Sequence, residues 1–284
     1  MIVHHLNCGC DKPVGGAFLD GRSRGLFGCL VCHCLLIETA TQGLVLVDTG
    51  YGLRDVRQPR SRISPLMLTL MNIQLREERT ALRQIEALGY AASDVRHVVV
   101  THLDFDHAGG LTDFPRARIH VTAEELSAAR GGDGGRTTGL RYRLAQFGEV
   151  DQWRAYRPAG ERWQGFEAVQ PLEGLPDGIL LVPLAGHTRG HAGVAVNSNR
   201  GWLLHAGDAY FHADEMTGQR RRCPPLLRAY QRLMEVDRRQ RRLNQSRLRR
   251  LIADRGGEIE VFCSHDAQEL ARAKAASNSA LIQG

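Results

Sequence analysis

The chain has 284 residues, 43% of them hydrophobic, which is enough to bury a large core in one long domain or two short ones. It opens without a basic stretch followed by an apolar run, and charges or glycines interrupt its longest apolar stretches. We therefore expect a cytoplasmic protein with no signal peptide and no membrane-spanning helix. The seven cysteines are an odd number, which argues against a secreted disulfide scaffold. The net charge of +6 comes nearly all from arginine and points only weakly to nucleic acid.

The first half of the chain predicts a hairpin, a helical segment and a buried strand. Residues 31–38 and 44–47 are rich in β-forming residues and are separated by a short polar turn, which is typical of a hairpin. Residues 53–78 are rich in arginine and proline and then carry an apolar face, so we expect an insertion or lid. Its apolar stretch fits a dimer surface, a substrate wall or core. Residues 80–88 have helical spacing, and the valine-rich run 95–100 predicts a buried strand.

The second half alternates strands and helices. We expect strands at 118–121, 179–183, 193–197, 202–206 and 259–262, helices at 124–129, 236–255 and 266–274, and a glycine-rich loop at 130–139. Strands in two groups, each followed by helices, predict two packed sheets covered by helices. No proline- or serine-rich linker divides the chain, so we expect one domain over residues 1–284.

A dense cluster of polar residues directly follows the expected strand at 95–100. Residues 101–110 read Thr-His-Leu-Asp-Phe-Asp-His-Ala-Gly-Gly and contain His102, Asp104, Asp106 and His107. Imidazoles and carboxylates both offer lone pairs at neutral pH, as a divalent metal requires. A polar turn is the simpler interpretation of this cluster alone, but three further elements argue against it.

Each of those elements also follows an expected strand. They are Gly-His-Thr-Arg-Gly-His at 186–191, Gly-Asp ending at Asp208, and Ser-His-Asp around His265. In this order the chain resembles the metallo-β-lactamase superfamily, whose motifs are His-x-His-x-Asp-His, a later His, an Asp and a last His. The resemblance implies an α+β fold, a four-layer αββα sandwich, with two divalent metal ions at one edge, most simply zinc.

The resemblance also implies a role for each ligand-type residue. The first metal would be held by His102, Asp104 and His191, the second by Asp106, His107 and His265, with Asp208 bridging both. Of the two histidines in the 186–191 element, we expect His191 rather than His187 to be the ligand. Asp48, at the end of its strand, would support the ligand loop from outside.

Position 104 departs from the family pattern, because the family's middle histidine is an aspartate here. Flavo-diiron proteins of the same superfamily carry a carboxylate at this place and bind iron, so the resemblance admits iron or manganese at the Asp104 site. A third carboxylate would bring the two-metal site close to neutral and weaken the first metal. The alternative function is therefore an iron-binding redox or non-hydrolytic metal protein of the same superfamily.

Within the superfamily, the long segment between Asp48 and His102 resembles the quorum-quenching lactonases. This implies a hydrolase in which a metal-bridging hydroxide opens a lactone, ester or thioester. Asp106 would also steer the nucleophile, and Tyr210 would donate a hydrogen bond to the oxyanion. The lactonase tyrosine falls one residue later, where this chain has Phe211.

The remaining polar residues favour structural roles. We expect His97, His120 and His205 to be satisfied core histidines and the cysteines to be small buried hydrophobes. The basic runs at 220–222 and 238–255 are typical of solvated faces, so nucleic acid is not an expected partner. The expected partners are a small-molecule substrate and a second copy of the chain, as a homodimer.

Overall fold

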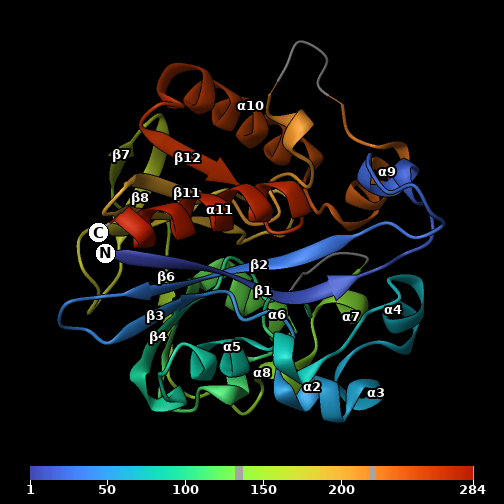
Figure 1. The fold of residues 1–284 in the computed structure, drawn as a ribbon, viewed down its shortest axis with the longest axis horizontal. Coiled ribbons are helices and arrows are strands. Elements are labelled where there is room, and N and C mark those ends of the chain that lie inside the picture. Colours follow the sequence, from blue (N-terminus) through green and yellow to red (C-terminus); the bar gives the residue numbers. More distant parts are fainter. Residues whose placement is uncertain (132–136, 218–221, 284) are drawn as a thin grey trace.

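The computed structural model describes residues 1–131, 137–217 and 222–283, which form two six-stranded sheets packed face to face with helices on both outer sides (Figure 1). The first sheet has the order β1-β2-β3-β4-β5-β6 and the second the order β12-β11-β10-β9-β8-β7. The expected four-layer αββα sandwich is confirmed.

The first sheet begins antiparallel and becomes parallel. Its strands are β1 (Ile2–Asp11), β2 (Leu30–Glu38), β3 (Leu44–Val47), β4 (Val95–Val99), β5 (Arg118–Thr122) and β6 (Trp153–Tyr156). The pairs from β1 to β3 are antiparallel and those from β3 to β6 are parallel. Every residue of β3 is buried, as expected for a parallel strand covered on both faces.

The second sheet is antiparallel except at its edge. Its strands are β7 (Glu161–Trp163), β8 (Phe166–Pro171), β9 (Ile179–Pro183), β10 (Ala192–Ser198), β11 (Gly201–His205) and β12 (Ile259–Phe262). Only β11 and β12 run parallel, joined by a helical crossover.

Side chains alternate between the inter-sheet core and the helical layers. In β2, Leu35 and Ile37 pack between the sheets with Val194 of β10, whereas Leu36 faces the helices on the other side. On the outer face of the second sheet, Leu248 of a long helix joins a third apolar cluster. These clusters hold the sheet edges, and the loops that leave them, in place.

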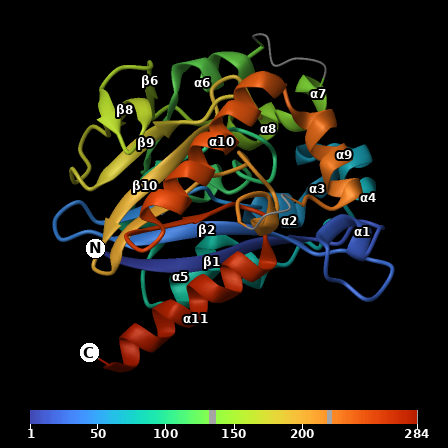
Figure 2. The same cartoon turned by 90° about the horizontal axis from the view of Figure 1, so that it is seen from above.

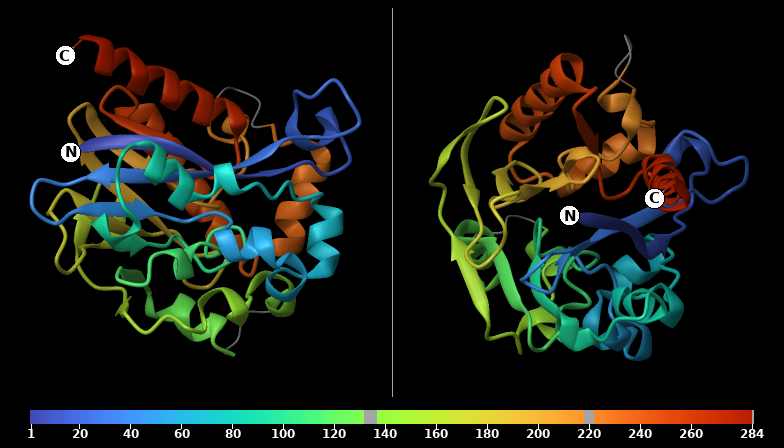
Figure 3. Two further views of the ribbon diagram at one scale, coloured as in Figure 1. Left: turned by 60° about the horizontal axis from the view of Figure 1, so that its bottom comes forward. Right: turned by 60° about the vertical axis from the view of Figure 1, so that its left-hand side comes forward.

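The helices form one layer on the outer face of each sheet, and one further helix lies along an edge of the sandwich (Figure 3). They are α1 (Ala17–Asp20), α2 (Leu53–Arg57), α3 (Pro59–Arg62), α4 (Pro65–Leu70), α5 (Ala81–Ala87), α6 (Ala123–Ala129), α7 (Thr138–Arg141), α8 (Leu144–Phe147), α9 (Pro225–Met234), α10 (Arg238–Arg255) and α11 (Ala267–Gln283). The helices α2 to α8 pack on the first sheet, α10 on the second, and α11 along β1. The short helices α1, α4 and α9 gather at one end of the sandwich (Figure 2).

The expected elements are present, with differences at their ends. The expected helix at 236–255 begins two residues later, because the Asp237 side chain accepts from the backbone N–H of Gln240 and caps it. β1, β6, β7, β8 and α9 were not expected. Residues 132–136 of the expected loop and Arg220 and Arg221 of the basic run lie outside the described residues.

The segment 53–78 folds as three short helices that are anchored in the core. Ile63 and Met67 are buried against the first sheet, while Leu66 and Leu70 are more than half exposed. The segment is therefore partly core, and its role as a lid stays a prediction. Within the described residues, no helix combines the length and apolar character that crossing a bilayer requires.

Candidate metal centre

Four loops bring the ligand-type residues to one edge of the sandwich. They follow β4, β11 and β12, and the fourth joins β9 to β10. Three of the four loops leave the carboxyl ends of β4, β11 and β12. β11 and β12 are parallel neighbours in the second sheet, and β4 is parallel to β3 in the first sheet. The loops are buried, so their polar side chains must find partners among themselves.

Asp208 lies at the centre of this cluster. Its Oδ1 is 3.2 Å from Nε2 of His265 and 3.4 Å from Nε2 of His107. Its Oδ2 is 3.4 Å from Nε2 of His187 and 3.7 Å from Nε2 of His102. Nε2 of His265 is also 3.2 Å from Oδ2, so this imidazole contacts both oxygens. The carboxylate of Asp208 therefore lies among four imidazoles, with His107 nearer Oδ1 and His187 and His102 nearer Oδ2.

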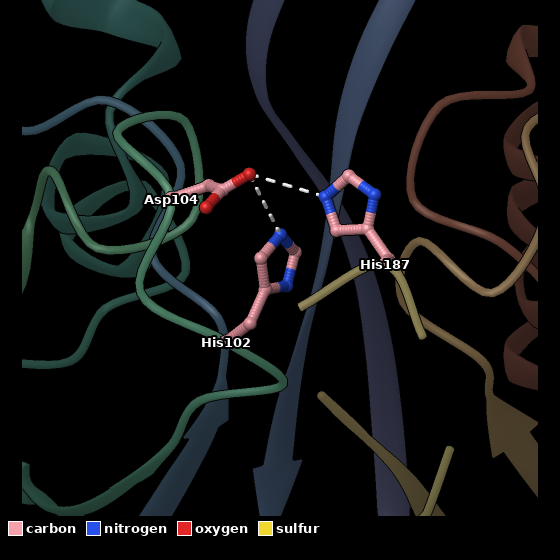
Figure 4. A group of neighbouring side chains, drawn as sticks. All are labelled: His102, Asp104 and His187. Carbon is pink, nitrogen blue, oxygen red and sulfur yellow. Dashed lines mark hydrogen bonds and ion pairs between the residues drawn. The ribbon is translucent and has the colours of Figure 1, made fainter. Parts of the chain in front are cut away.

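Asp104 faces one of these pairs (Figure 4). Its Oδ2 is 3.1 Å from Nε2 of His187 and 3.6 Å from Nε2 of His102. Burial alone would raise the pKa of Asp104, but the Arg141 guanidinium and then His102 hold it well below its ordinary value. Asp104 is therefore an ionised carboxylate in position to act as a ligand, despite its departure from the family pattern.

Asp106 faces the other pair. Its Oδ2 is 3.6 Å from Nε2 of His265 and 3.9 Å from Nε2 of His107. The structure thus brings together two groups of potential ligands, Asp104 with two imidazoles and Asp106 with two others, on either side of Asp208.

The facing atoms lack hydrogen-bond partners, which is the strongest sign of a cation site. Among the described residues, Nε2 of His102, Nε2 of His107 and Oδ1 of Asp208 face the cluster and are buried without a hydrogen bond. Leaving a buried polar atom unpaired costs about 1–3 kcal/mol, and here several converge on one point. Divalent metal ions between them would satisfy these atoms, so the residues fit the expected metals.

The charges of the cluster also favour a cation. Burial alone would lower the pKa of His265, but Asp208 and Asp106 raise it to about 9. By contrast, burial lowers the pKa of His187 to about 4, so this imidazole is neutral at pH 7. Without metal the carboxylates hold protons on nearby imidazoles, so protons and metal ions compete for the same nitrogen lone pairs.

Residues outside the cluster fix the histidine rings. Asp48 Oδ2 lies 2.8 Å from Nδ1 of His107 and accepts from the Thr101 hydroxyl at 2.8 Å. That hydroxyl lies 2.9 Å from Nδ1 of His102, and Nδ1 of His265 lies 2.7 Å from a backbone carbonyl of β2. With Nδ1 engaged in this way, Nε2 of each ring faces the cluster and is the nitrogen that can bind an ion once it carries no proton. Asp48 thus occupies the supporting position that the sequence suggested.

His191 does not lie with the other ligand-type residues, and His187 takes the place beside Asp104 that was expected for His191. The ligand role of His191 stays a prediction. Nδ1 of His191 lies 3.0 Å from the Leu184 carbonyl, and its Nε2 accepts from the backbone N–H of Asp208 at 2.8 Å. Both ring nitrogens are therefore engaged by backbone. A Cβ added at Gly207 would come within 2.5 Å of Nε2 of His191, so this ring packs directly against the backbone that precedes Asp208.

Tyr210, from which an oxyanion contact was expected, points away from the cluster in this structure. Its side chain is fully buried, and its hydroxyl donates to Glu269 at 3.0 Å. The next residue, Phe211, takes the inward position and stacks on His265 with ring centroids 5.1 Å apart and planes 9° apart.

Tyr230 of α9 lies next to Phe211, near enough to the cluster for its carboxylates to act on the pKa of this phenol. Its ring meets Phe211 edge-on, with centroids 6.0 Å apart. Burial raises its pKa well above 10, and the carboxylates of Asp106 and Asp104 raise it further, so the phenol is a proton donor at neutral pH. No hydrogen bond to its hydroxyl occurs within the described ranges. No sequence motif marked this residue, because α9 itself was not expected.

Glu125 was also missed, although it ties the ligand loops together. This fully buried carboxylate accepts from the backbone N–H of Leu103, the Tyr142 hydroxyl at 3.0 Å and the Thr188 hydroxyl at 2.5 Å. It therefore links the loop after β4 to the loop between β9 and β10. In the sequence it is one of two adjacent glutamates at the start of a helix, with nothing to distinguish it.

Other polar residues have structural partners, as expected. His97 and His120 bond to each other at 2.8 Å in the first sheet. Nε2 of His205 lies 2.6 Å from the backbone carbonyl of His33, and Cys263 is buried in the apolar cluster of the second sheet. All seven cysteines are free thiols.

Comparison with known proteins agrees with this geometry. A probable metallo-hydrolase of Mycobacterium tuberculosis is 44% identical over 264 residues, covering 93% of this chain and 80% of that protein. An acyl-coenzyme A thioesterase of Bos taurus is 29% identical over 176 residues, 59% of this chain and 54% of that protein. An N-acyl homoserine lactone hydrolase, solved with N-hexanoyl-L-homoserine bound at its catalytic metal centre, matches with a TM-score of 0.70 at 19% identity, covering 95% of this chain and 96% of that one.

The family itself is established by a match that spans most of the chain. The model of the metallo-beta-lactamase superfamily matches residues 27–265, which include every ligand-type residue described above. With the αββα sandwich and the His/Asp cluster at its edge, this shows that the chain belongs to the metallo-β-lactamase superfamily.

Proposed function

We propose that this protein is a dinuclear metal-dependent hydrolase that opens a lactone, ester or thioester. The observation that carries the proposal is the set of buried, unpaired imidazole and carboxylate atoms that face one another around Asp208. Unpaired polar atoms are rare in a folded core, and bound cations would supply partners for several of them at once. Zinc is the proposed metal, because imidazole and carboxylate ligands both suit it.

The proposed ligands divide into two sets that share Asp208. The first ion would be held by His102, Asp104 and His187, and the second by Asp106, His107 and His265. When bound, two such ions supply a water acidified to near neutral pH and a Lewis acid for the substrate carbonyl. The pairing of Asp104 with His187 supports the assignment of these two residues to one ion.

The chain's own groups prepare the site for an acyl substrate. Asp48 and Thr101 orient His107 and His102 so that Nε2 of each ring faces the cluster, where an ion would take the place of any proton on that atom. Phe211 covers one face of His265 and gives the site an apolar wall. Asp106 is the proposed residue for orienting the attacking water, because it is a carboxylate at the rim of the cluster.

Tyr230 is the proposed hydrogen-bond donor to the carbonyl oxygen as charge develops there. Tyr230→Phe is expected to lower kcat/KM by about 10- to 100-fold, since one oxyanion donor contributes a few kcal/mol at most. Zinc content should not change. Tyr210→Phe is the matched control: it removes a buried hydrogen bond to Glu269, so the free energy of unfolding should fall by about 1 kcal/mol with turnover retained. A lower kcat/KM in Tyr210→Phe, with an unchanged kcat/KM in Tyr230→Phe, would instead support Tyr210 as the hydrogen-bond donor.

The substrate class is inferred from the chemistry of similar proteins. One is a lactone hydrolase and another an acyl-coenzyme A thioesterase, and both reactions attack an acyl carbonyl. A site with one apolar wall and one phenol donor suits that carbonyl. Acyl lactones and acyl thioesters are therefore the proposed substrates, with phosphodiesters as the contrasting class.

The function is tested by stripping the protein with a chelator and reloading it with zinc, manganese or iron. We expect the stripped protein to be inactive and the zinc-loaded protein, with about two ions per chain, to hydrolyse lactones or thioesters. Full activity of metal-free protein would refute the proposal. Coloured protein with two irons and no hydrolysis of any substrate would favour the iron-binding alternative.

A further inference from the structure

A buried ion pair stands directly behind Asp104. Nε of Arg141, at the end of α7, lies 3.6 Å from Oδ1 of Asp104. Arg141 is fully buried, and Asp104 is 3% exposed. The other oxygen of Asp104, Oδ2, faces His187 and His102. One carboxylate oxygen is therefore directed to a cation of the protein and the other to the proposed first metal.

Arg141 is held rigidly in this place. One of its terminal nitrogens donates to the backbone carbonyl of His187 at 3.1 Å, and the other donates to the backbone carbonyl of Met234. Its guanidinium carbon lies 5.9 Å from the centre of the Tyr142 ring. These contacts use both terminal nitrogens, whereas Nε has no hydrogen-bond partner among the described residues. The side of the guanidinium that carries Nε is thus turned to Asp104.

The backbone holds the two partners together as well. Asp104 and Tyr142 form an antiparallel bridge, so the residue after Arg141 pairs with the residue that Arg141 faces. Glu125 accepts from both Leu103 and Tyr142, and so binds the neighbours of both partners. The position of Arg141 relative to Asp104 is therefore determined by several independent contacts.

We propose that Arg141 is the positioning residue that makes Asp104 a ligand of the first metal. By occupying Oδ1 it leaves Oδ2 to face the metal, and its charge offsets the third carboxylate of the centre. The inference rests on the proposed dinuclear centre and deepens it. On this proposal the extra carboxylate is accompanied by one buried guanidinium, so the charge of Asp104 is offset within the protein.

Selectivity follows from where Arg141 lies. It contacts Asp104 and the carbonyl of His187, both on the side of the first metal. Within the described part of the chain, Arg141 makes no hydrogen bond or ion pair with Asp106, His107 or His265, the second set. Loss of its charge should therefore weaken the first ion and spare the second. Removing an outer partner of a metal ligand typically lowers metal affinity by about 10- to 100-fold.

The test measures zinc alone, by titration calorimetry and by metal analysis of the dialysed chain. Wild type is expected to retain two zinc ions per chain. Arg141→Met should retain about one, with the first-site affinity reduced about 10- to 100-fold. Arg141→Lys should recover part of the loss, because it keeps the charge. The matched control is Arg241→Met, which removes a buried arginine paired with Glu235 at 2.6 Å and should leave zinc binding unchanged.

A double variant separates positioning from a role in folding. In Asp104→His with Arg141→Met, a neutral imidazole needs no compensating cation, so the first site should bind zinc again. If Arg141 merely supported the fold, changing Asp104 could not restore the ion. Circular dichroism checks that each variant is folded.

The outcomes also separate this inference from the proposed function. Wild type that binds fewer than two zinc ions contradicts the dinuclear centre itself. Wild type with two ions and Arg141→Met with the same two affinities overturns only the role of Arg141. Unfolding of all the Arg141 variants, including the double variant, would overturn it too, since Arg141 would then be needed for folding whatever residue stands at 104.

Discussion

Asp208→Ala is expected to abolish hydrolysis, with kcat/KM lowered on the order of 10³-fold or more. Its carboxylate lies among imidazoles of both proposed ligand sets, so one substitution removes a ligand from both proposed ions. The four buried imidazoles around position 208 would then have one carboxylate fewer beside them, and this loss of negative charge disfavours binding of either ion. Zinc content per chain should fall in parallel with activity.

The control is Asp214→Ala, six residues later in the same loop region. Its side chain is 58% exposed and lies in no metal group, so activity and zinc content should match wild type. Asp208→Ala with two tightly held zinc ions would contradict the bridging role, even if activity were lost.

His187→Gln is expected to remove the first ion and lower kcat/KM by about 10³-fold, because an amide is a poor replacement for an imidazole ligand. His191→Gln should keep both ions and change kcat/KM by no more than about threefold. Glutamine can still accept from the Asp208 N–H and donate to the Leu184 carbonyl, so only about 1 kcal/mol of unfolding free energy should be lost.

The pair is informative because both histidines lie in the same short loop. Metal analysis and urea unfolding of the two variants distinguish a ligand from a structural ring. Loss of the first ion in His191→Gln, with His187→Gln unaffected, would restore the assignment that the sequence favoured and would mean that the loop is arranged differently when metal is bound.

The fold and the family could be predicted from the sequence because their signals are local. The valine-rich run at 95–100 is followed at once by four ligand-type residues, and buried β4 and its loop lie where this pattern predicts. Asp208 and His265 follow apolar runs in the same way. An apolar run specifies a strand by its own composition, and the polar residue at its end is placed by the strand alone.

β1 and the strands from β6 to β8 show where that reasoning stops. β1 carries polar residues such as His4 and Asn7 among its apolar ones, and it is stabilised mainly by pairing along β2. β6 and β7 contain almost no buried residue. Such strands depend on neighbours distant in the sequence, so their own composition identifies them poorly.

What the sequence by itself determined is therefore the αββα sandwich and the set of residues from which a metal centre is drawn. Which of them face one another was decided only by the tertiary structure. His187 rather than His191, Phe211 rather than Tyr210, and Arg141 behind Asp104 all depend on where a loop side chain points. That direction is set by hydrogen bonds to partners far along the chain, such as the Asp208 N–H that holds His191. Residue type and spacing along the sequence do not contain this information.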